Sequence, residues 1–347
     1  MQSVAGKGIL FRHGFLFGLL GAVVLAFLFP EWGAKDGPLR AGRVAQAGVF
    51  LIFFLQGLSL RTQEMLRGFG NLRLHSLVQA WIFLVGAAFL LAVAFFLRRT
   101  GTALAPLADG FIFLALLPTT ISSAVAFTAT AGGNTAGAIV NTTFANIVGV
   151  FWVPAGCLLF FATGEGLQAE MVAPLLLKLG KLILLPLLCG HLVRPLVRES
   201  PLYRRLQPGF RPAQNAAILF IVFASFSQSL RADMGSEISP LYLGGLLSAV
   251  ILSLLFLHRS LWLVSGWLLT AKEDRVTALF CGAQRTLAAG APMALAIFGG
   301  KGAISSHDPG MILLPLLCYH PLQLFLAGML LPILRCGRPT RTRTSNG

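Results

Sequence analysis

Charge is what this sequence has little of. Only 11% of its 347 residues are Asp, Glu, Lys or Arg, whereas 56% are hydrophobic, and the mean hydropathy is +0.79. A soluble domain carries roughly 25% charged residues, because its surface must face water. The deficit runs along the whole chain, so a single buried helix does not account for it. The composition therefore excludes an ordinary soluble protein and indicates an integral membrane protein.

Several chemical signatures are also missing. The five cysteines follow no metal-ligand spacing and four of them lie in apolar runs, which is typical of buried free thiols. No Gly-x-x-x-x-Gly-Lys-Ser/Thr loop is present, which argues against direct ATP drive. The net charge of +15 comes from Lys and Arg scattered at the ends of apolar runs, a pattern that does not indicate nucleic-acid binding. We expect no cofactor and no metal other than a sodium ion.

What the chain does have is a series of long apolar runs. A helix needs about 20 mostly apolar residues to cross the hydrocarbon core, and these runs lack the alternation of barrel strands. The sequence therefore predicts an all-α polytopic membrane protein with ten transmembrane helices. The predicted spans are 15–30, 44–60, 75–97, 110–131, 134–162, 171–194, 212–230, 240–266, 275–299 and 309–334.

The distribution of Lys and Arg predicts the orientation. With a cytoplasmic N-terminus, the inside segments hold more than twice as many Lys and Arg as the outside segments. An even number of spans then places both termini in the cytoplasm, and we expect the protein in the inner or plasma membrane. Residues 335–347 are basic and rich in Thr, which predicts a disordered cytoplasmic tail.

A short motif occurs twice in the chain. The segments 59–65 and 229–234 both read Ser-Leu-Arg, then a small residue, an acid and Met, with one extra Gln in the first copy. The offset is five spans, and an odd number of spans per repeat forces the two copies to insert with opposite topology. We therefore predict two inverted five-helix repeats, 1–165 and 166–334.

The fourth and ninth predicted spans are one repeat apart, and both are interrupted. The fourth contains Pro118 followed closely by four hydroxyl side chains, and the ninth contains Gly282 to Thr286, with Pro292 further on. Unwound backbone is tolerated at membrane depth only inside protein or along a water-filled cavity. There, free carbonyls hold cations and helix N-termini face anions. The alternative is a proline kink whose hydroxyls bond to their own helix.

Arg285 is the most informative single residue, because a charge within a span is costly and is a functional hypothesis by default. It can bind an anionic group bidentately. Two other roles stay open: a partner for helix carbonyls, and a fixed cation in place of a coupling ion. Asn134, Asn141 and Thr142 of the fifth span share one helix face, although polar side chains also join helices. The residues that we expect to bind substrate are Thr119, Thr120, Ser122, Asn134, Asn141, Arg285 and Thr286.

These motifs resemble the bile acid:sodium symporter family, in particular its sodium/bile-acid cotransporter-like branch, which includes the seventh member of solute carrier family ten. The resemblance covers nearly the whole chain, and its most specific pieces are 118–125, 132–134 and 280–293. It implies two inverted repeats, a panel domain, and a core domain in which the broken helices 4 and 9 cross. It also implies alternating access, in which one domain moves against the other.

The resemblance further implies ion ligands, which are carried over one position at a time. Ser123 and Thr142 match the ligands of one sodium ion, but alanines stand where an Asn and a Ser would be. Gln79 and Gln284 match ligands of a second sodium ion. Phe280 stands where that family has a glutamate that touches both ions. The ion-binding candidates are thus Gln79, Ser123, Thr142 and Gln284, without their carboxylate.

The sequence predicts a secondary transporter of a small organic anion, with the lipid bilayer as its surroundings and Na⁺ as a candidate coupling ion. The alternatives that stay open are an uncoupled facilitator or channel, a proton-coupled carrier and a non-transporting membrane regulator. An intramembrane enzyme is disfavoured, because neither Ser122 nor Ser123 lies in a Gly-x-Ser-x-Gly elbow. The substrate, the stoichiometry and the oligomeric state, a monomer included, are left open by the residues.

Overall fold

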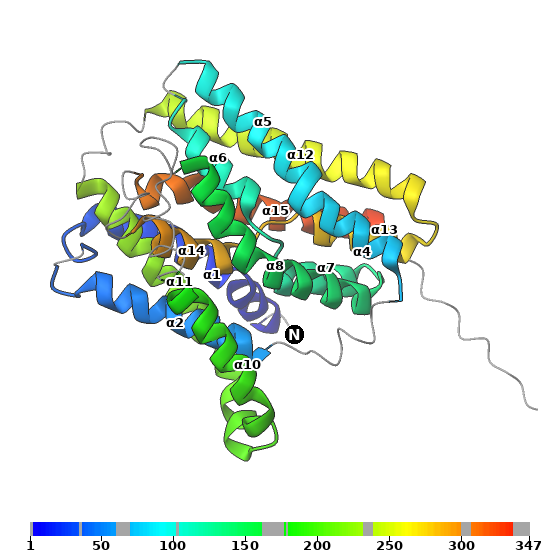
Figure 1. Cartoon of the computed structure of the whole chain (residues 1–347), viewed down its shortest axis with the longest axis horizontal. Helices are drawn as coiled ribbons and strands as arrows, with labels where there is room; N and C mark the ends of the chain where they lie inside the picture. The colour runs from blue at the N-terminus through cyan, green and yellow to red at the C-terminus, as the bar shows by residue number, and fades with distance from the viewer. Residues whose placement is uncertain are drawn as a thin grey trace, which may run out of the picture.

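The computed structural model describes residues 3–34, 37–59, 70–101, 104–161, 177, 180–231, 239–299 and 307–335. All regular structure in these residues is helical (Figure 1). The elements are α1 (Ser3–Leu28), α2 (Ala41–Ser59), α4 (Leu72–Ala80), the π-helical turn η1 (Trp81–Val85), α5 (Gly86–Arg99), α6 (Leu107–Leu116), α7 (Ile121–Thr130), α8 (Thr135–Phe161), the π-helical turn η2 (Gly180–Leu184), α10 (Leu185–Val197), α11 (Pro201–Arg231), α12 (Pro240–Leu268), α13 (Lys272–Gly282), α14 (Leu287–Phe298) and α15 (Pro309–Leu334).

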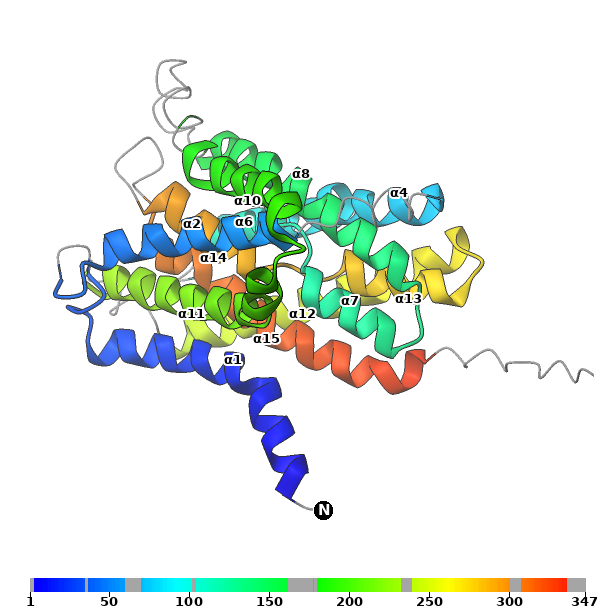
Figure 2. The ribbon, with the colours of Figure 1, turned by 90° about the horizontal axis from the view of Figure 1, so that it is seen from below.

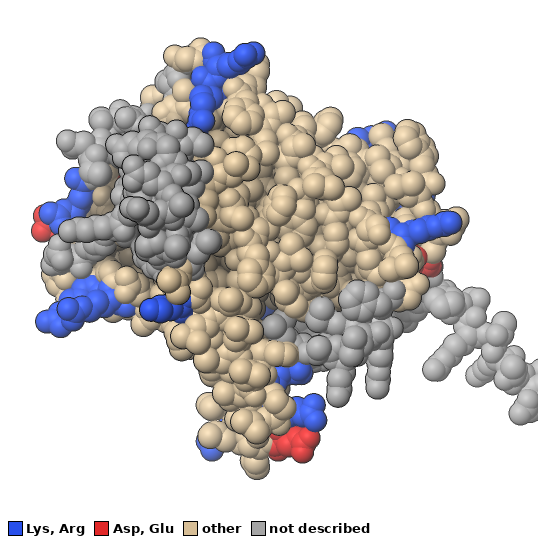
Figure 3. All heavy atoms as spheres, viewed as in Figure 1, with Lys and Arg blue, Asp and Glu red and all other residues tan. Residues whose placement is uncertain are grey.

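Among the described residues, seven helices are long and apolar enough to cross a membrane, and the α6–α7 pair, bent by 65°, makes an eighth. Residues Gly14–Leu28 of α1 form a shorter apolar helix, and α13 and α14 lie outside this set. The all-α membrane class is confirmed, and each predicted span falls on a helix or a helix pair. The count of ten crossings stays a prediction. Figure 3 shows the corresponding surface: a broad uncharged middle, with Lys and Arg at its margins.

Two helix boundaries differ clearly from the prediction. The seventh span was expected to begin at residue 212, but α11 begins at Pro201 and includes Pro208 and Pro212. Charged residues and prolines mark where apolar sequence ends, whereas a helix continues as long as its backbone hydrogen bonds do. Similarly, α1 begins well before residue 15. The predicted start of the sixth span, 171–176, lies outside the described residues, and the helix there is described from Gly180.

The helices form two groups. In the first, α1 packs against α11, α2 packs against α10, and α2 also packs against α11. We call α1, α2, η2, α10 and α11 the panel group, and the remaining helices the core group. Gly57 of α2 and Gly190 of α10 allow the closest approach, because a Cβ on either glycine would lie within 3.0 Å of a backbone nitrogen of the other helix. Within the core group, α5 and α12 run side by side (Figure 1), and Phe89 stacks on Phe256.

The buried apolar residues form two clusters that occupy opposite ends of the molecule. The larger cluster lies at the Asp308 end, where α15 begins, and it includes residues of both groups, among them Ile52, Ile221 and Leu313. The smaller cluster lies at the Asp274 end, where α13 begins. All of its residues come from the core group, with examples in Leu74, Val276 and Ala327. Figure 2 shows α7 and α13 at this end, away from α2 and α11. The two groups are thus packed together at the Asp308 end.

Candidate functional site

The first break in the crossing helices is Leu117–Thr120, between α6 and α7. Leu117 is extended (φ −71°, ψ 140°), as expected for a residue that precedes a proline, and Thr120 is extended as well (φ −83°, ψ 135°). Thr120 gives α7 no side-chain cap, so the first N–H groups of α7 are not satisfied in that way. The predicted interruption of the fourth span is therefore a true break and not a kink in a continuous helix.

The second break is Ala283–Thr286, between α13 and α14. Thr286 is extended (φ −88°, ψ 121°), and its hydroxyl accepts a hydrogen bond from the N–H of Ala289 at 3.4 Å. Two side chains of α15 hold the backbone of this break. The hydroxyl of Tyr319 donates to the carbonyl of Ala283 at 2.9 Å, and Gln323 pairs with both the N–H and the carbonyl of Arg285 at 2.8 Å each.

The two breaks meet inside the protein. The N–H of Thr286 donates to the carbonyl of Pro118 at 3.0 Å. The Ser123 hydroxyl donates to Oε1 of Gln284 at 2.8 Å and lies 3.1 Å from the hydroxyl of Thr120. These two stretches, more than 160 residues apart in sequence, are therefore in direct contact, and their role as a binding site stays a prediction. The structure brings together Thr119, Thr120, Ser123, Gln284, Arg285 and Thr286.

A neighbouring asparagine of α8, Asn146, links the first break to the panel group. Its Nδ2 donates to the carbonyls of Thr119 and Thr142 at 2.8 Å each, and its Oδ1 accepts from Gln56 of α2 at 3.4 Å. Asn146, Gln56 and Gln323 are not among the site residues predicted from the sequence. The signal that all three share is an amide side chain within an apolar run.

Three predicted site residues make contacts elsewhere. Gln79 donates from Nε2 to Asn141, whose carbonyl and side-chain oxygen both lie at 3.1 Å. The hydroxyl of Thr142 donates to the carbonyl of Ala138 within its own helix, at 2.8 Å. These contacts fit the role of joining and stabilising helices, which the sequence left open for the polar residues of the fifth span.

Asn134 lies at the Asp274 end, away from the breaks. Its Nδ2 donates to Asp274 at 2.8 Å, and the same carboxylate accepts from Asn71 at 2.6 Å. Thr277 of α13 donates to the carbonyl of Asn134 at 3.2 Å. Gly132, with φ +76°, makes the turn that brings Asn134 to this position. The conspicuous Gly-Gly-Asn sequence thus ties the α7–α8 connection to α13.

Arg285 is almost completely buried, with 1% of its surface exposed. Its Nη2 donates to the carbonyl of Ile82 at 3.2 Å, in the π-helical turn η1. A π-helical turn shifts the hydrogen-bond ladder, so a carbonyl becomes available to an outside donor. Gly86 makes room for the guanidinium, since a Cβ there would lie 2.9 Å from Nη2. No carboxylate among the described residues forms an ion pair with Arg285, and its Nε and Nη1 have no partner.

The position at which the resemblance calls for a glutamate is filled by an aromatic contact. Phe280 is fully buried, and its ring stacks on Phe127 of α7 at 5.6 Å with an angle of 27°. In contrast, Ser122 is exposed at the start of α7. The site therefore combines a buried guanidinium and an accessible, uncapped helix N-terminus, and no carboxylate is hydrogen-bonded to the described residues of either break.

Two broken helices that meet inside a bundle of apolar helices are the arrangement of a secondary transporter, in which discontinuous helices form the site. Sequence comparison assigns the family within that class. The chain belongs to the SBF-like CPA transporter family, whose profile matches residues 13–336. The resemblance to the bile acid:sodium symporters is thereby confirmed, and the family consists of transporters rather than enzymes.

Curated relatives match over nearly their whole length. A protein of Escherichia coli (strain K12) named putative symporter YfeH is 30% identical over 320 residues, which is 91% of both chains. The sodium/bile acid cotransporter 7 of Mus musculus is 30% identical over 342 residues, which is 96% of this chain and 95% of that one. The protein of the same name from Danio rerio is 29% identical over 342 residues.

Proposed function

We propose that this protein is a secondary transporter that carries a small organic anion across the membrane by alternating access. The anion binds where the two broken helices meet. The observation that carries the proposal is an imbalance at this crossing: carbonyl oxygens are already occupied by protein donors, whereas nitrogen donors around a buried positive charge are not.

Four carbonyls that could hold a cation are taken. They belong to Pro118, Thr119, Ala283 and Arg285, and each accepts a hydrogen bond from the protein. Among the described residues of the two breaks, the nitrogen donors that lack a partner are Nε2 of Gln284 and the Nε and Nη1 atoms of Arg285, and the hydroxyl of Thr119 lacks one as well. A buried guanidinium without a carboxylate is electrostatically costly, and an anion that enters the site relieves that cost. The crossing is therefore suited to a negatively charged ligand.

The N-terminus of α7 is the part of the site that faces the substrate. It carries no side-chain cap, and Ser122 beside it is exposed. The first N–H groups of a helix together with its dipole favour an anion. Gln56 and Asn146, which link α2 to α8, add amide groups between the panel group and the core group. A carboxylate or sulfonate at Ser122 and a larger organic body against α2 would satisfy this arrangement.

The residues that correspond to sodium ligands do not form the two sodium sites that the resemblance implies. The four sodium-ligand candidates are divided among separate hydrogen bonds, Ser123 with Gln284, Gln79 with Asn141, and Thr142 with its own helix. The pair of Phe280 and Phe127 occupies the place of the expected carboxylate. We therefore propose that transport does not require sodium, and that the anion moves down its own gradient or together with a proton.

The packing of the helices supports two repeats, 1–165 and 166–334. If the spans are numbered in order, several contacts in one half have a counterpart in the other half. The contact of α1 with α11 corresponds to that of α10 with α2, and the contact of α5 with α6 corresponds to that of α12 with α13. The contacts of α7 with α8 and of α14 with α15 form another such pair. This correspondence is expected of inverted repeats that move as a panel and a core.

The basic residues support a cytoplasmic Asp274 end, in agreement with the orientation predicted from the sequence. Arg73 and Lys272 lie at this end. Arg198, which follows α10, and Arg204 and Arg205, near the start of α11, lie in the connection that the predicted topology places on the same side of the membrane. With this orientation, we propose that the panel and the core are packed together on the external side and that the α7 site faces the cytoplasm.

Thermal unfolding of the detergent-purified protein tests this proposal, because a ligand that binds only the folded state stabilises it by mass action. Organic carboxylates and sulfonates would be compared with their neutral amides, in sodium and in potassium at constant ionic strength. We expect a saturable stabilisation by at least one anion, absent with its amide, weakened by Ser122→Ala and insensitive to sodium. Thr130→Ala, at the other end of α7, is the matched control.

Other outcomes would contradict the proposal. A saturable sodium-specific stabilisation that is lost in Ser123→Ala or Gln284→Ala would show that a sodium site is still built. The protein would then be a sodium symporter of the kind that its relatives' names describe. Equal stabilisation by the anions and their amides would exclude the proposed charge recognition. Flux in liposomes that does not saturate, and is not stimulated by substrate on the opposite side, would indicate a channel.

A further inference from the structure

One hydrogen bond joins the panel group to the core group where the two are packed together. Ser229 lies near the end of α11, in the panel group, and its hydroxyl donates to the carboxylate of Asp308. Asp308 is the N-cap of α15, in the core group, and the same carboxylate oxygen accepts from the N–H groups of Gly310 and Met311 at 2.8 and 3.1 Å. The contact therefore links a panel helix directly to the start of a core helix.

Gly310 makes this contact close. A Cβ on Gly310 would lie 3.0 Å from the Cβ of Ser229, which is tighter than ordinary van der Waals contact. Ser229 is 5% exposed and Asp308 is partly exposed, so the hydrogen bond is partly buried. A hydrogen bond to a carboxylate is among the stronger ones in proteins.

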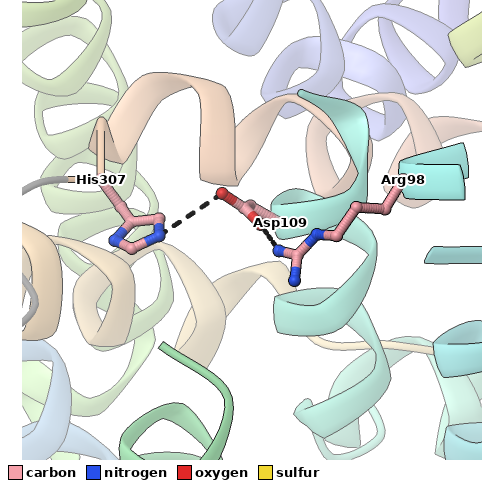
Figure 4. Close-up of polar contacts among 3 residues, drawn as sticks. All are labelled: Arg98, Asp109 and His307. Carbon is pink, nitrogen blue, oxygen red and sulfur yellow. Dashed lines mark hydrogen bonds and ion pairs between the residues drawn. The ribbon is translucent and has the colours of Figure 1, made fainter. Parts of the chain in front are cut away.

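The turn that carries Asp308 is fixed to the core on its other side. His307 lies with its Nε2 3.5 Å from Asp109 of α6, and Asp109 also forms an ion pair with Arg98 of α5 (Figure 4). The imidazole ring of His307 is in edge contact with the ring of Phe161, with centroids 5.0 Å apart. Asp308 is thus held as part of the core, so a displacement of α11 relative to the core has to break its bond to Ser229.

At the Asp274 end the core group has a buried cluster of its own, to which the panel group contributes nothing among the described residues. The two ends therefore differ in whether panel and core are closed against each other. We propose that the contact of Ser229 with Asp308 across Gly310 is a gate, which closes the Asp308 side of the pathway and separates when substrate passes on that side. The inference rests on the proposed transport function.

A disulfide across the gate tests the proposal. In a chain whose five native cysteines are replaced, Ser229→Cys and Gly310→Cys would place two thiols on Cβ atoms 3.0 Å apart, which is shorter than the usual separation of roughly 3.5–4.5 Å, so the two helices have to move slightly apart for the disulfide to form. The control pair is Gly48→Cys with Ala217→Cys, whose Cβ atoms would be 3.5 Å apart and which joins α2 to α11 within the panel group. Oxidation would be verified by mass spectrometry.

The readout needs no known substrate. A third cysteine, Ser122→Cys, reports on the site, and a membrane-impermeant maleimide would be applied to oriented proteoliposomes from either side after oxidation. We expect labelling from the Asp308 side to fall at least tenfold in the Ser229–Gly310 pair and to be unchanged in the control pair. Reduction should restore it, which would show that the cross-linked protein is folded.

Two other outcomes are distinguishable. Labelling from the Asp308 side that persists in the oxidised gate pair would overturn the gate while leaving the transport proposal standing. A reduced protein in which Ser122→Cys is never labelled from the Asp308 side would show that the site does not alternate, which overturns the gate and the proposed function together.

Discussion

The two breaks in the crossing helices occupy corresponding places in the two halves of the chain, but their backbones are held differently. The second break, Ala283–Thr286, is clamped by Tyr319 and Gln323 of α15 and contains the buried Arg285. The first break, Leu117–Thr120, opens into an α7 helix without a cap, and its neighbour Ser122 is exposed. The comparison suggests that one break supplies the fixed positive charge and the other supplies the accessible binding surface.

The largest effect is expected from the clamp on the second break. Gln323→Leu removes two hydrogen bonds to the backbone of Arg285 and leaves a buried N–H and a buried carbonyl without partners. Each unsatisfied group costs about 1–3 kcal/mol, so we expect the free energy of unfolding to fall by about 2–6 kcal/mol. Unfolding in detergent would measure this change.

Gln56→Leu is the control for that prediction, because Gln56 makes a single, longer hydrogen bond, of 3.4 Å, near the first break. It should cost less than about 1 kcal/mol, the usual contribution of a polar contact between membrane helices. Equal losses in the two variants would show that the breaks are held equally.

The second prediction concerns the charge itself. Arg285→Met keeps an apolar side chain of similar length and removes the unpaired guanidinium, so the fold should be retained. We expect the affinity for the stabilising anion to fall about tenfold to a hundredfold, or about 1.4–2.7 kcal/mol. A titration followed by thermal shift would measure it.

Arg99→Met, at the end of α5, is the matched control for the loss of one positive charge. An affinity for the anion that is the same in both variants would mean that Arg285 serves only to bond the carbonyl of Ile82.

The third prediction tests the fit around Arg285. Gly86→Ala would place a methyl group 2.7 Å from the carbonyl of Trp81 and 2.9 Å from Nη2 of Arg285. We expect a loss of about 1–3 kcal/mol of stability from overpacking, accompanied by weaker anion binding. Gly244→Ala, in α12, meets nothing within 4 Å and should be neutral or slightly stabilising. Similar stabilities for the two variants would contradict the packing of Arg285 against η1.

The smallest effects separate two adjacent serines of α7. Ser122→Ala should weaken anion binding about threefold to fivefold with little change in stability, because Ser122 is exposed and its loss strands no partner. Ser123→Ala should instead lower stability by about 1 kcal/mol, because Gln284 loses its donor. Melting temperatures and anion titrations of both variants would settle this difference, and a reversed pattern would place the substrate on the other face of α7.

Much of the architecture could be predicted from the sequence, because a helix that crosses the hydrocarbon core needs about 20 mostly apolar residues. Each apolar run that is long enough became a helix, and the tenth predicted span, 309–334, coincides with α15. Helix ends outside the apolar region were not accessible, as in α11, because nothing in a polar segment forces a helix to stop at the membrane surface.

The site was predicted only in part. Pro118 and the hydroxyl side chains after it marked the first break, and Arg285 marked the second, because each of these residues costs free energy inside an apolar span. Asn134 and Gln79 carried the same signal of polarity, yet the structure pairs them with Asp274 and Asn141. A polar residue within a span indicates that it has a partner, but not whether the partner is a substrate or another helix.

The sequence by itself determined that this protein lies in a membrane, where its helices are, the two places at which they break, and its family. Local composition is sufficient for these features, since a backbone in lipid must satisfy its own hydrogen bonds. Only the tertiary structure decided which groups at the crossing are already occupied and which are free, because the carbonyls of one break are satisfied by donors distant in sequence, such as Gln323 and Thr286. It likewise decided that panel and core close against each other at Asp308 and not at Asp274, because that depends on how whole helices pack.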